Sequence, residues 1–206
     1  LIIAIGARLD EFTTLSYSSP STSQKLIHID QSPEVTGGSW LGADLALVAD
    51  AGEAMDKLEE ALKNSKHAKP SKARQKQIAD WCEYYTKRTT PRGNRIGFKD
   101  GTIDLEGIYH DILNILTDDA SITCDAGDFG SWLIRYYKWN KPRTFFGPTT
   151  GAMGYALPAA IAARLARPQA PAIAFAGDGG FAMTMSELET AVRLKLAGLV
   201  VLVFNN

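Results

Sequence analysis

Residues 171–180, PAIAFAGDGG, and residues 199–206, LVVLVFNN, decide the fold of this chain. Each stretch begins with a short apolar run typical of a buried strand, and residues 185–196 between them carry apolar side chains at helical spacing. A strand, a helix and a second strand predict a parallel pair whose carboxyl ends lie at the same edge of a sheet. Open α/β sheets bind ligands at that edge, so the residues after each strand are candidates for a site.

Glycines and oxygen-bearing side chains follow the two strands. Asp178 stands among Gly177, Gly179 and Gly180 after the first strand, and Asn206 stands after the second. A carboxylate and an amide oxygen suit Mg²⁺, and glycines let backbone N–H groups approach phosphate oxygens. The pattern predicts a metal–diphosphate site with Asp178 and Asn206 as metal ligands. The alternative is an ordinary turn followed by a polar loop, because short glycine motifs often match by chance.

Composition excludes several classes of protein. The 206 residues are 45% hydrophobic with a net charge of −1, which predicts a globular chain with no basic field for nucleic acid. No apolar run reaches membrane-spanning length. Cys82 and Cys124 are far apart, so we expect buried thiols in a reducing cytoplasm rather than a disulfide or a zinc site. The chain starts inside an apolar run and stops on a binding motif, so we expect a piece of a longer protein.

Residues 1–63 form the first predicted block. Short apolar runs ending in Gly or Asp predict strands at 1–6, 25–30 and 45–50. A helix is predicted at 52–62, where apolar residues share one face. Such runs favour part of a parallel, Rossmann-like sheet.

A linker and a second block follow. Residues 64–100 are charged and predict a linker with one helix at 75–87. Residues 101–206 predict the second block, with a helix capped by Asp104 and a strand at 120–124 before the pair described above. The predicted fold class is therefore α/β, with parallel, doubly wound sheets.

The Gly-Asp-Gly motif, the spacer and the final Asn-Asn resemble the thiamine diphosphate signature of the 2-oxo-acid decarboxylase and acetolactate synthase superfamily. The resemblance covers nearly the whole chain and is strongest over residues 149–206. It implies that residues 1–63 end a Rossmann-like central domain and that residues 101–206 begin a diphosphate-binding domain. It also implies thiamine diphosphate and Mg²⁺ as cofactors, a 2-oxo acid substrate, and a homodimer or homotetramer.

The resemblance implies decarboxylation of a 2-oxo acid followed by carboligation, as in acetolactate synthase large subunits. A simple 2-oxo-acid decarboxylase or related C–C lyase remains an alternative, and so does a non-catalytic relative that binds the cofactor. In this family the glutamate that activates the thiamine comes from another domain, so no catalytic residue is assigned here. We therefore expect the isolated chain to be inactive.

The stretch Gly151-Ala152-Met153-Gly154 has two interpretations. Taken alone, it favours a glycine-rich start of a helix with Met153 filling a gap in the core. The resemblance instead places the stretch beneath the thiamine. The Gly151 carbonyl would then accept from the aminopyrimidine, and Met153 would hold the cofactor bent.

Five residues near the predicted strand ends of the first block are candidates for a nucleotide site: Gly6, Arg8, Asp10, Asp30 and Asp50. Asp30 stands where Rossmann-like folds place a ribose-binding acid, but the single glycine at the first turn lacks the dinucleotide fingerprint. The resemblance implies FAD at these positions. Relatives keep this domain while binding ADP or nothing, so FAD, ADP and no ligand all remain open.

One segment departs from the family pattern. Acetolactate synthases carry Gln-His-Gln near the diphosphate, shortly before a Trp, whereas here Asp128-Phe129-Gly130 precede Trp132. An acid beside a diphosphate is unfavourable unless it is turned away or paired. The departure argues against strict acetolactate synthase activity and leaves thiamine diphosphate binding in place.

Overall fold

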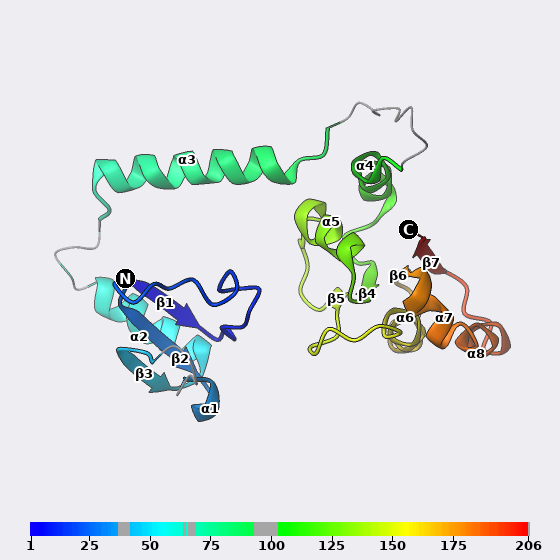
Figure 1. The fold of residues 1–206 in the computed structure, drawn as a ribbon, viewed down its shortest axis with the longest axis horizontal. Helices are drawn as coiled ribbons and strands as arrows, with labels where there is room; N and C mark the ends of the chain where they lie inside the picture. Colours follow the sequence, from blue (N-terminus) through cyan, green and yellow to red (C-terminus); the bar gives the residue numbers. More distant parts are fainter. Residues whose placement is uncertain (37–41, 64, 66–68, 93–102, 206) are drawn as a thin grey trace. The chain divides into compact units, whose positions relative to one another are not determined.

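The computed structural model describes residues 1–36, 42–63, 65, 69–92 and 103–205. They form two compact units, Leu1–Lys76 and Gln77–Asn206, each built on its own parallel sheet (Figure 1). The predicted α/β fold with parallel sheets is confirmed. None of the helices in the described stretches is both long enough and apolar enough to span a membrane.

The first unit holds a three-stranded sheet with the strands in chain order. The strands are β1 (Ile2–Ile5), β2 (Leu26–Asp30) and β3 (Leu45–Val48), close to the predicted positions. A short helix α1 (Pro33–Thr36) follows β2, and α2 (Ala51–Lys63) follows β3. Burial is shallow, because every residue of β3 is exposed and α2 has no buried residue.

Helix α3 (Lys72–Thr89) contains the helix predicted in the linker, and the two units divide within it. Its apolar residues Ile78, Trp81 and Tyr84 are all exposed, and only Thr89 is buried. The expectation of a buried Cys82 is wrong, because this thiol lies on the same exposed helix. The predicted domain limits at residues 63 and 100 remain a prediction.

The second unit holds a four-stranded sheet in the order β5-β4-β6-β7. Its strands are β4 (Ser121–Cys124), β5 (Phe145–Phe146), β6 (Ala172–Gly177) and β7 (Leu199–Phe204). The central strands β4 and β6 are buried along almost their whole length. Strands buried on both faces require helices on both sides of the sheet.

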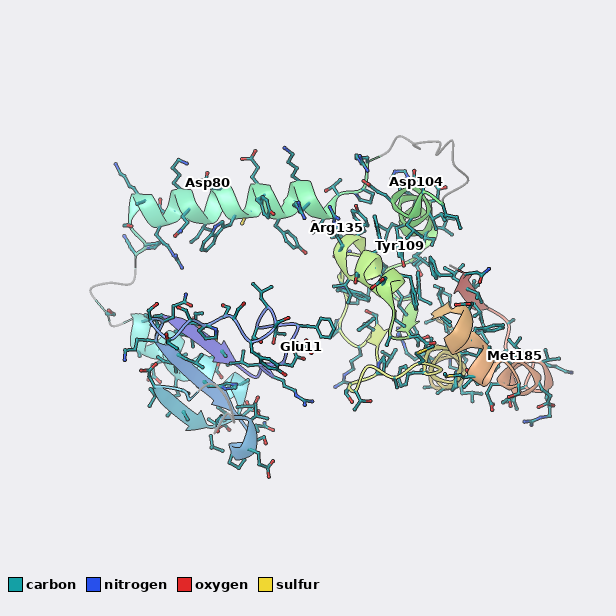
Figure 2. All side chains as sticks on the ribbon, in the orientation of Figure 1. Glu11, Asp80, Asp104, Tyr109, Arg135 and Met185 are labelled. Carbon is teal, nitrogen blue, oxygen red and sulfur yellow. The ribbon has the colours of Figure 1, made fainter. Side chains whose placement is uncertain are left out.

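The described helices of this unit after α3 are α4 (Leu105–Ile115), α5 (Asp128–Tyr136), α6 (Ala156–Ala166), α7 (Asp178–Thr184) and α8 (Glu187–Arg193) (Figure 1). Helices α4 and α5 pack on one face of β6 through an aromatic cluster that includes Tyr109 and Phe175. On the other face, alanines of α6 pack against alanines of β6. Asp104 caps α4 as predicted, accepting from the Gly107 N–H at 3.1 Å (Figure 2).

The helix predicted at residues 185–196 is wrong in its limits. Helix α7 starts at Asp178, directly after β6, and α8 ends at Arg193. Sequence reasoning missed α7 because two adjacent glycines disfavour a helix. Gly180 is buried in its first turn, so tertiary packing rather than local preference stabilises the helix there.

Candidate cofactor site

Strands β6 and β7 end side by side. Gly177 pairs with Phe204, so Asp178 and Asn205 follow at the same edge of the sheet. Asp178 is exposed, and within the described stretches its side chain has no hydrogen bond or ion pair. The second predicted ligand, Asn206, lies outside the described residues. The described part of the chain holds no group of three His, Cys, Asp or Glu suited to a metal. Amide, backbone or phosphate oxygens would have to complete a coordination sphere around Asp178.

The 151–154 loop packs against the first turn of α7. Gly151 and Gly154 have φ of +67° and +78°, a left-handed conformation that favours glycine. A Cβ at Gly179 would lie 3.1 Å from Met153 Cε, and one at Gly154 would lie 3.3 Å from Met183 Cβ. The structure therefore brings together the two glycine-rich segments that the sequence singled out. Their close approach leaves no room for larger residues.

Met153 keeps 48% of its surface exposed, although it contacts the α7 turn. A methionine that fills a core gap would be buried on most sides. Met153 is thus only partly buried in this unit, and its role as a cofactor contact stays a prediction.

Asp125 is a site residue that sequence reasoning passed over. It follows β4, is only 4% exposed, and lies against Gly180. Its Oδ1 accepts from the Ala156 N–H at 2.6 Å, and its Oδ2 accepts from the Gly154 N–H at 3.1 Å. The rule that selected Asp178, an acid directly after a buried strand, would also have found Asp125.

The departing segment, residues 128–130, lies at the same edge. Asp128 is exposed at the start of α5, so its carboxylate faces water. The Phe129 ring stacks on Phe204, with centroids 5.1 Å apart, and lies 3.3 Å from the position of a Cβ at Gly177. The Tyr109 hydroxyl donates to the Phe129 carbonyl at 2.7 Å, and burial raises the pKa of Tyr109. Phe129 thus gives this edge an apolar wall.

In the first unit the candidate nucleotide residues follow the strands as expected. Gly6 follows β1 with φ of +58°, and Arg8 and Asp10 lie in the loop after it. Asp30 ends β2, and Asp50 lies between β3 and α2. The strands are parallel, so their carboxyl ends share one edge of the sheet.

Two of these acids act as local caps. Asp10 Oδ1 accepts from the Thr13 N–H at 2.9 Å. Asp50 accepts from the Glu53 N–H at 3.0 Å and from the Gln31 side-chain amide at 2.6 Å. These hydrogen bonds, with the backbone N–H bond the strongest in each case, hold the pKa of Asp10 and of Asp50 below the ordinary value.

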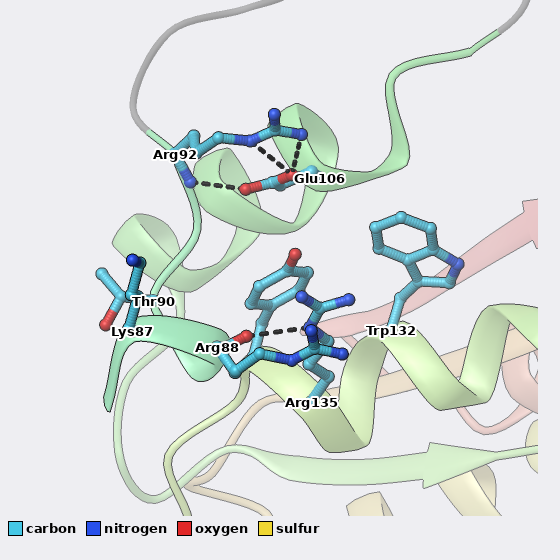
Figure 3. A pocket seen from close by; sticks show the side chains of 8 residues that line it. Lys87, Arg88, Thr90, Arg92, Glu106, Trp132 and Arg135 are labelled. Atoms are coloured by element: carbon cyan, nitrogen blue, oxygen red, sulfur yellow. Dashed lines mark hydrogen bonds and ion pairs between the residues drawn. The ribbon is translucent and has the colours of Figure 1, made fainter. Parts of the chain in front are cut away.

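A pocket of about 230 Å³ lies where the end of α3 meets α4 and α5 (Figure 3). Its lining is rich in cations: Lys87, Arg88, Thr90, Arg92, Glu106, Trp132, Arg135 and Tyr136. Arg92 donates from Nε and Nη2 to Glu106 Oε2 at 2.9 and 2.5 Å, and this hydrogen bonding holds the pKa of Glu106 below its usual value. The Arg135 Nε also donates to the Arg88 carbonyl at 2.8 Å. Within the second unit, these contacts hold the end of α3 and the residues after it against α4 and α5.

Residues 125–206 match a family model described as the C-terminal TPP binding domain of thiamine pyrophosphate enzymes. The match begins at Asp125 and includes the 151–154 loop and the glycines that follow β6. The chain therefore resembles the class of enzymes that depend on thiamine diphosphate, and this domain match supports thiamine diphosphate as the cofactor.

The curated relatives narrow the resemblance to acetolactate synthase. The chain is 29% identical over 201 residues to the acetolactate synthase large subunit of Buchnera aphidicola subsp. Schizaphis graminum, covering 97% of this chain and 34% of the relative. It is 27% identical over 202 residues to the isozyme 3 large subunit of Escherichia coli, covering 98% and 34%. It is 30% identical over 207 residues to the acetolactate synthase large subunit of Porphyra purpurea, covering 100% of this chain and 34% of the relative. The chain spans about a third of the length of these relatives. The resemblance to thiamine diphosphate enzymes of the acetolactate synthase type, which the sequence motifs indicated, is confirmed.

Proposed function

We propose that the second unit binds thiamine diphosphate through Mg²⁺ held by Asp178 and Asn206, within an enzyme that acts on a 2-oxo acid. The observation that carries this proposal is the packing of the 151–154 loop on the start of α7, beside an exposed Asp178. Glycine backbone beside a carboxylate can receive phosphate oxygens and their metal ion.

The remaining roles follow the same arrangement. Gly177, Gly179 and Gly180 would leave space for the diphosphate, the Gly151 carbonyl would accept from the aminopyrimidine, and Met153 would support the bent thiamine. When bound, thiamine diphosphate supplies the electron sink that lets a 2-oxo acid lose CO₂, and the protein supplies position and electrostatics. The half-exposed Met153 fits the role proposed for it.

For the intact protein we propose decarboxylation followed by carboligation, in line with the names of the relatives. A simple 2-oxo-acid decarboxylase or related lyase is the second candidate. It is kept because residues 128–130 depart from the pattern of acetolactate synthases. Product analysis after incubation of the intact protein with pyruvate separates the two, because only carboligation joins two substrate molecules.

Further proposals concern the intact protein. The activating glutamate would come from another domain of a partner subunit, so we propose a homodimer or homotetramer. The strand-end positions of Gly6, Asp30 and Asp50 support a site for FAD or ADP in the first unit. A cytoplasmic location agrees with the free thiols of Cys82 and Cys124.

Calorimetry of the intact protein with thiamine diphosphate tests the metal anchor. We expect tight binding with Mg²⁺ and a loss of at least ~10–100-fold with EDTA, since weakening even an outer-shell contact of a metal costs that much. Asp178→Ala should show the same loss. The matched control is Glu83→Ala, an exposed acid on α3 outside the candidate site, which should bind like the wild type. Unchanged affinity in EDTA would overturn the proposal.

The isolated 206-residue chain provides a second test. We expect it to release no CO₂ from pyruvate, because the activating glutamate belongs to another domain in the family it resembles. Release of CO₂ by the purified chain would show that the activating glutamate is not required from another domain.

A further inference from the structure

The carboxylate of Asp125 is buried where segments from three parts of the second unit meet. It follows β4, accepts from backbone N–H groups at Gly154 and Ala156, and lies against Gly180. Within the described stretches it forms no ion pair with a basic side chain. A buried carboxylate without a cation requires strong hydrogen bonds, and here backbone N–H groups provide them.

The two carboxylate oxygens of Asp125 bind backbone N–H groups two residues apart in the same turn. Oδ2 holds Gly154, which ends the 151–154 loop in a left-handed conformation, and Oδ1 holds Ala156 at the start of α6. The neighbouring Ala126 N–H donates to the Ala152 carbonyl at 3.4 Å, and the Asp125 N–H donates to the Phe175 carbonyl at 2.9 Å. Asp125 is therefore fixed to β6 on one side and fixes the loop on the other.

The start of α7 closes the remaining side of the carboxylate. A Cβ at Gly180 would overlap Asp125 Oδ2 and would lie 3.3 Å from the Gly154 nitrogen. On the adjacent surface, a Cβ at Gly179 would lie 3.1 Å from Met153 Cε. The carboxylate thus contacts both the loop and the α7 turn at the place where these two segments meet.

We propose that Asp125 is a positioning residue that holds Met153 and the glycines of α7 in the arrangement that receives thiamine diphosphate. The inference rests on the proposed function of that site. An asparagine has one acceptor oxygen where Asp125 uses two, so Asn would leave one of the two N–H groups facing an NH₂ donor. A buried unpaired N–H is costly, and the loop would move to pair it with water.

The test compares Asp125→Asn with the control Glu83→Gln, an exposed acid on α3, in the intact protein. We expect Asp125→Asn to weaken thiamine diphosphate binding in Mg²⁺ about tenfold or more, by analogy with other supporting contacts at metal sites. Turnover at saturating cofactor should stay within a few-fold of wild type, because Asp125 does not touch the reacting atoms. Glu83→Gln should change neither value. An Asp125→Asn protein that melts at a lower temperature but binds the cofactor normally would overturn the inference.

A double-mutant cycle tests the contact with Gly180. Gly180→Ala alone should weaken cofactor binding, because its methyl group displaces the carboxylate. In the Asp125→Ala background the clash with the carboxylate is gone and only the 3.3 Å approach to the Gly154 nitrogen remains, so Gly180→Ala should weaken binding much less there than in the wild type. Losses that multiply in the double variant would contradict the proposed contact.

Amide hydrogen exchange separates this inference from the proposed function. In cofactor-free protein, exchange at Gly154 and Ala156 should be slow in the wild type and faster in Asp125→Asn. Wild-type protein that binds no thiamine diphosphate would refute the proposed function, whatever the variant does. Wild-type exchange rates and cofactor affinity in Asp125→Asn would refute the positioning role alone.

Discussion

Both units place acids after parallel strands, but they use these acids differently. In the first unit, Asp10 and Asp50 accept from N–H groups three residues further along the chain, at Thr13 and Glu53. In the second unit, Asp125 accepts from groups 29 and 31 residues away. The first arrangement caps local turns, whereas the second joins distant segments. The carboxylate of Asp125 therefore connects backbone segments that lie far apart in the sequence.

The two sheets differ in burial as well. All residues of β3 are exposed and all residues of β4 are buried. A sheet covered on both faces is a rigid base, and loops on a rigid base can hold a ligand geometry that shallow packing cannot. The candidate cofactor site accordingly lies on the second unit.

The largest effect should come from the core of the second sheet. Phe175 is 0% exposed and stacks with Tyr109 and Phe204, at centroid distances of 5.9 and 6.1 Å. Phe175→Ala should lower the free energy of unfolding by about 3–5 kcal/mol, the usual cost of such a cavity. The control Leu47→Ala in β3 should cost about 1 kcal/mol or less. Chemical denaturation measures the free energy of unfolding of both variants. Equal losses would show that the two sheets do not differ in how much their burial contributes to stability.

The next largest effect concerns Met153. Removing an apolar side chain that covers a ligand costs roughly 1.5–3 kcal/mol, so Met153→Ala should weaken thiamine diphosphate binding about 10–100-fold. The apo-protein should melt almost normally because this side chain is half exposed. Met153→Leu should restore binding, and Met185→Ala, at an exposed position after α7, should be silent. A large loss of apo stability with normal activity at saturating cofactor would make Met153 a packing residue.

The contrast between the units also explains what the sequence could predict. Apolar periodicity predicted β6, β7 and their shared edge, since those patterns depend on neighbours along the chain. It could not predict α7, because the Gly-Gly pair is helical only through packing on Asp125 and Gly154. The position of Asp125 after a buried strand was visible in the sequence, but its hydrogen bonds to Gly154 and Ala156 were not, because these partners lie far along the chain. The left-handed conformations of Gly151 and Gly154, on either side of Met153, were not predicted either, because apolar periodicity does not report backbone angles.

A smaller effect is expected at Tyr109, whose hydroxyl connects α4 to the apolar wall at the cofactor edge. Tyr109→Phe removes its hydrogen bond to the Phe129 carbonyl and should cost about 1 kcal/mol, or somewhat more if that carbonyl stays buried and unpaired. The control Tyr84→Phe, on the exposed face of α3, should be neutral. Thermal melts measure the stability of the two variants. Equal melting temperatures would show that the Tyr109 hydroxyl does not stabilise the fold.

The smallest effect should come from the local cap at Asp50. The hydrogen bond from the Glu53 N–H, followed by that from the Gln31 amide, holds the pKa of this exposed carboxyl below its ordinary value of 3.8. A group whose pKa is lower in the folded state stabilises it above the unfolded pKa, and this stabilisation is lost as pH falls through the folded pKa. Asp50→Asn should therefore lower the melting temperature slightly at pH 7, and the difference from wild type should shrink below the ordinary pKa. The control Asp56→Asn, on exposed α2, should follow the wild type at both pH values. If the Asp50→Asn difference were as large in acid as at neutral pH, the effect would come from packing rather than from the charge of the cap.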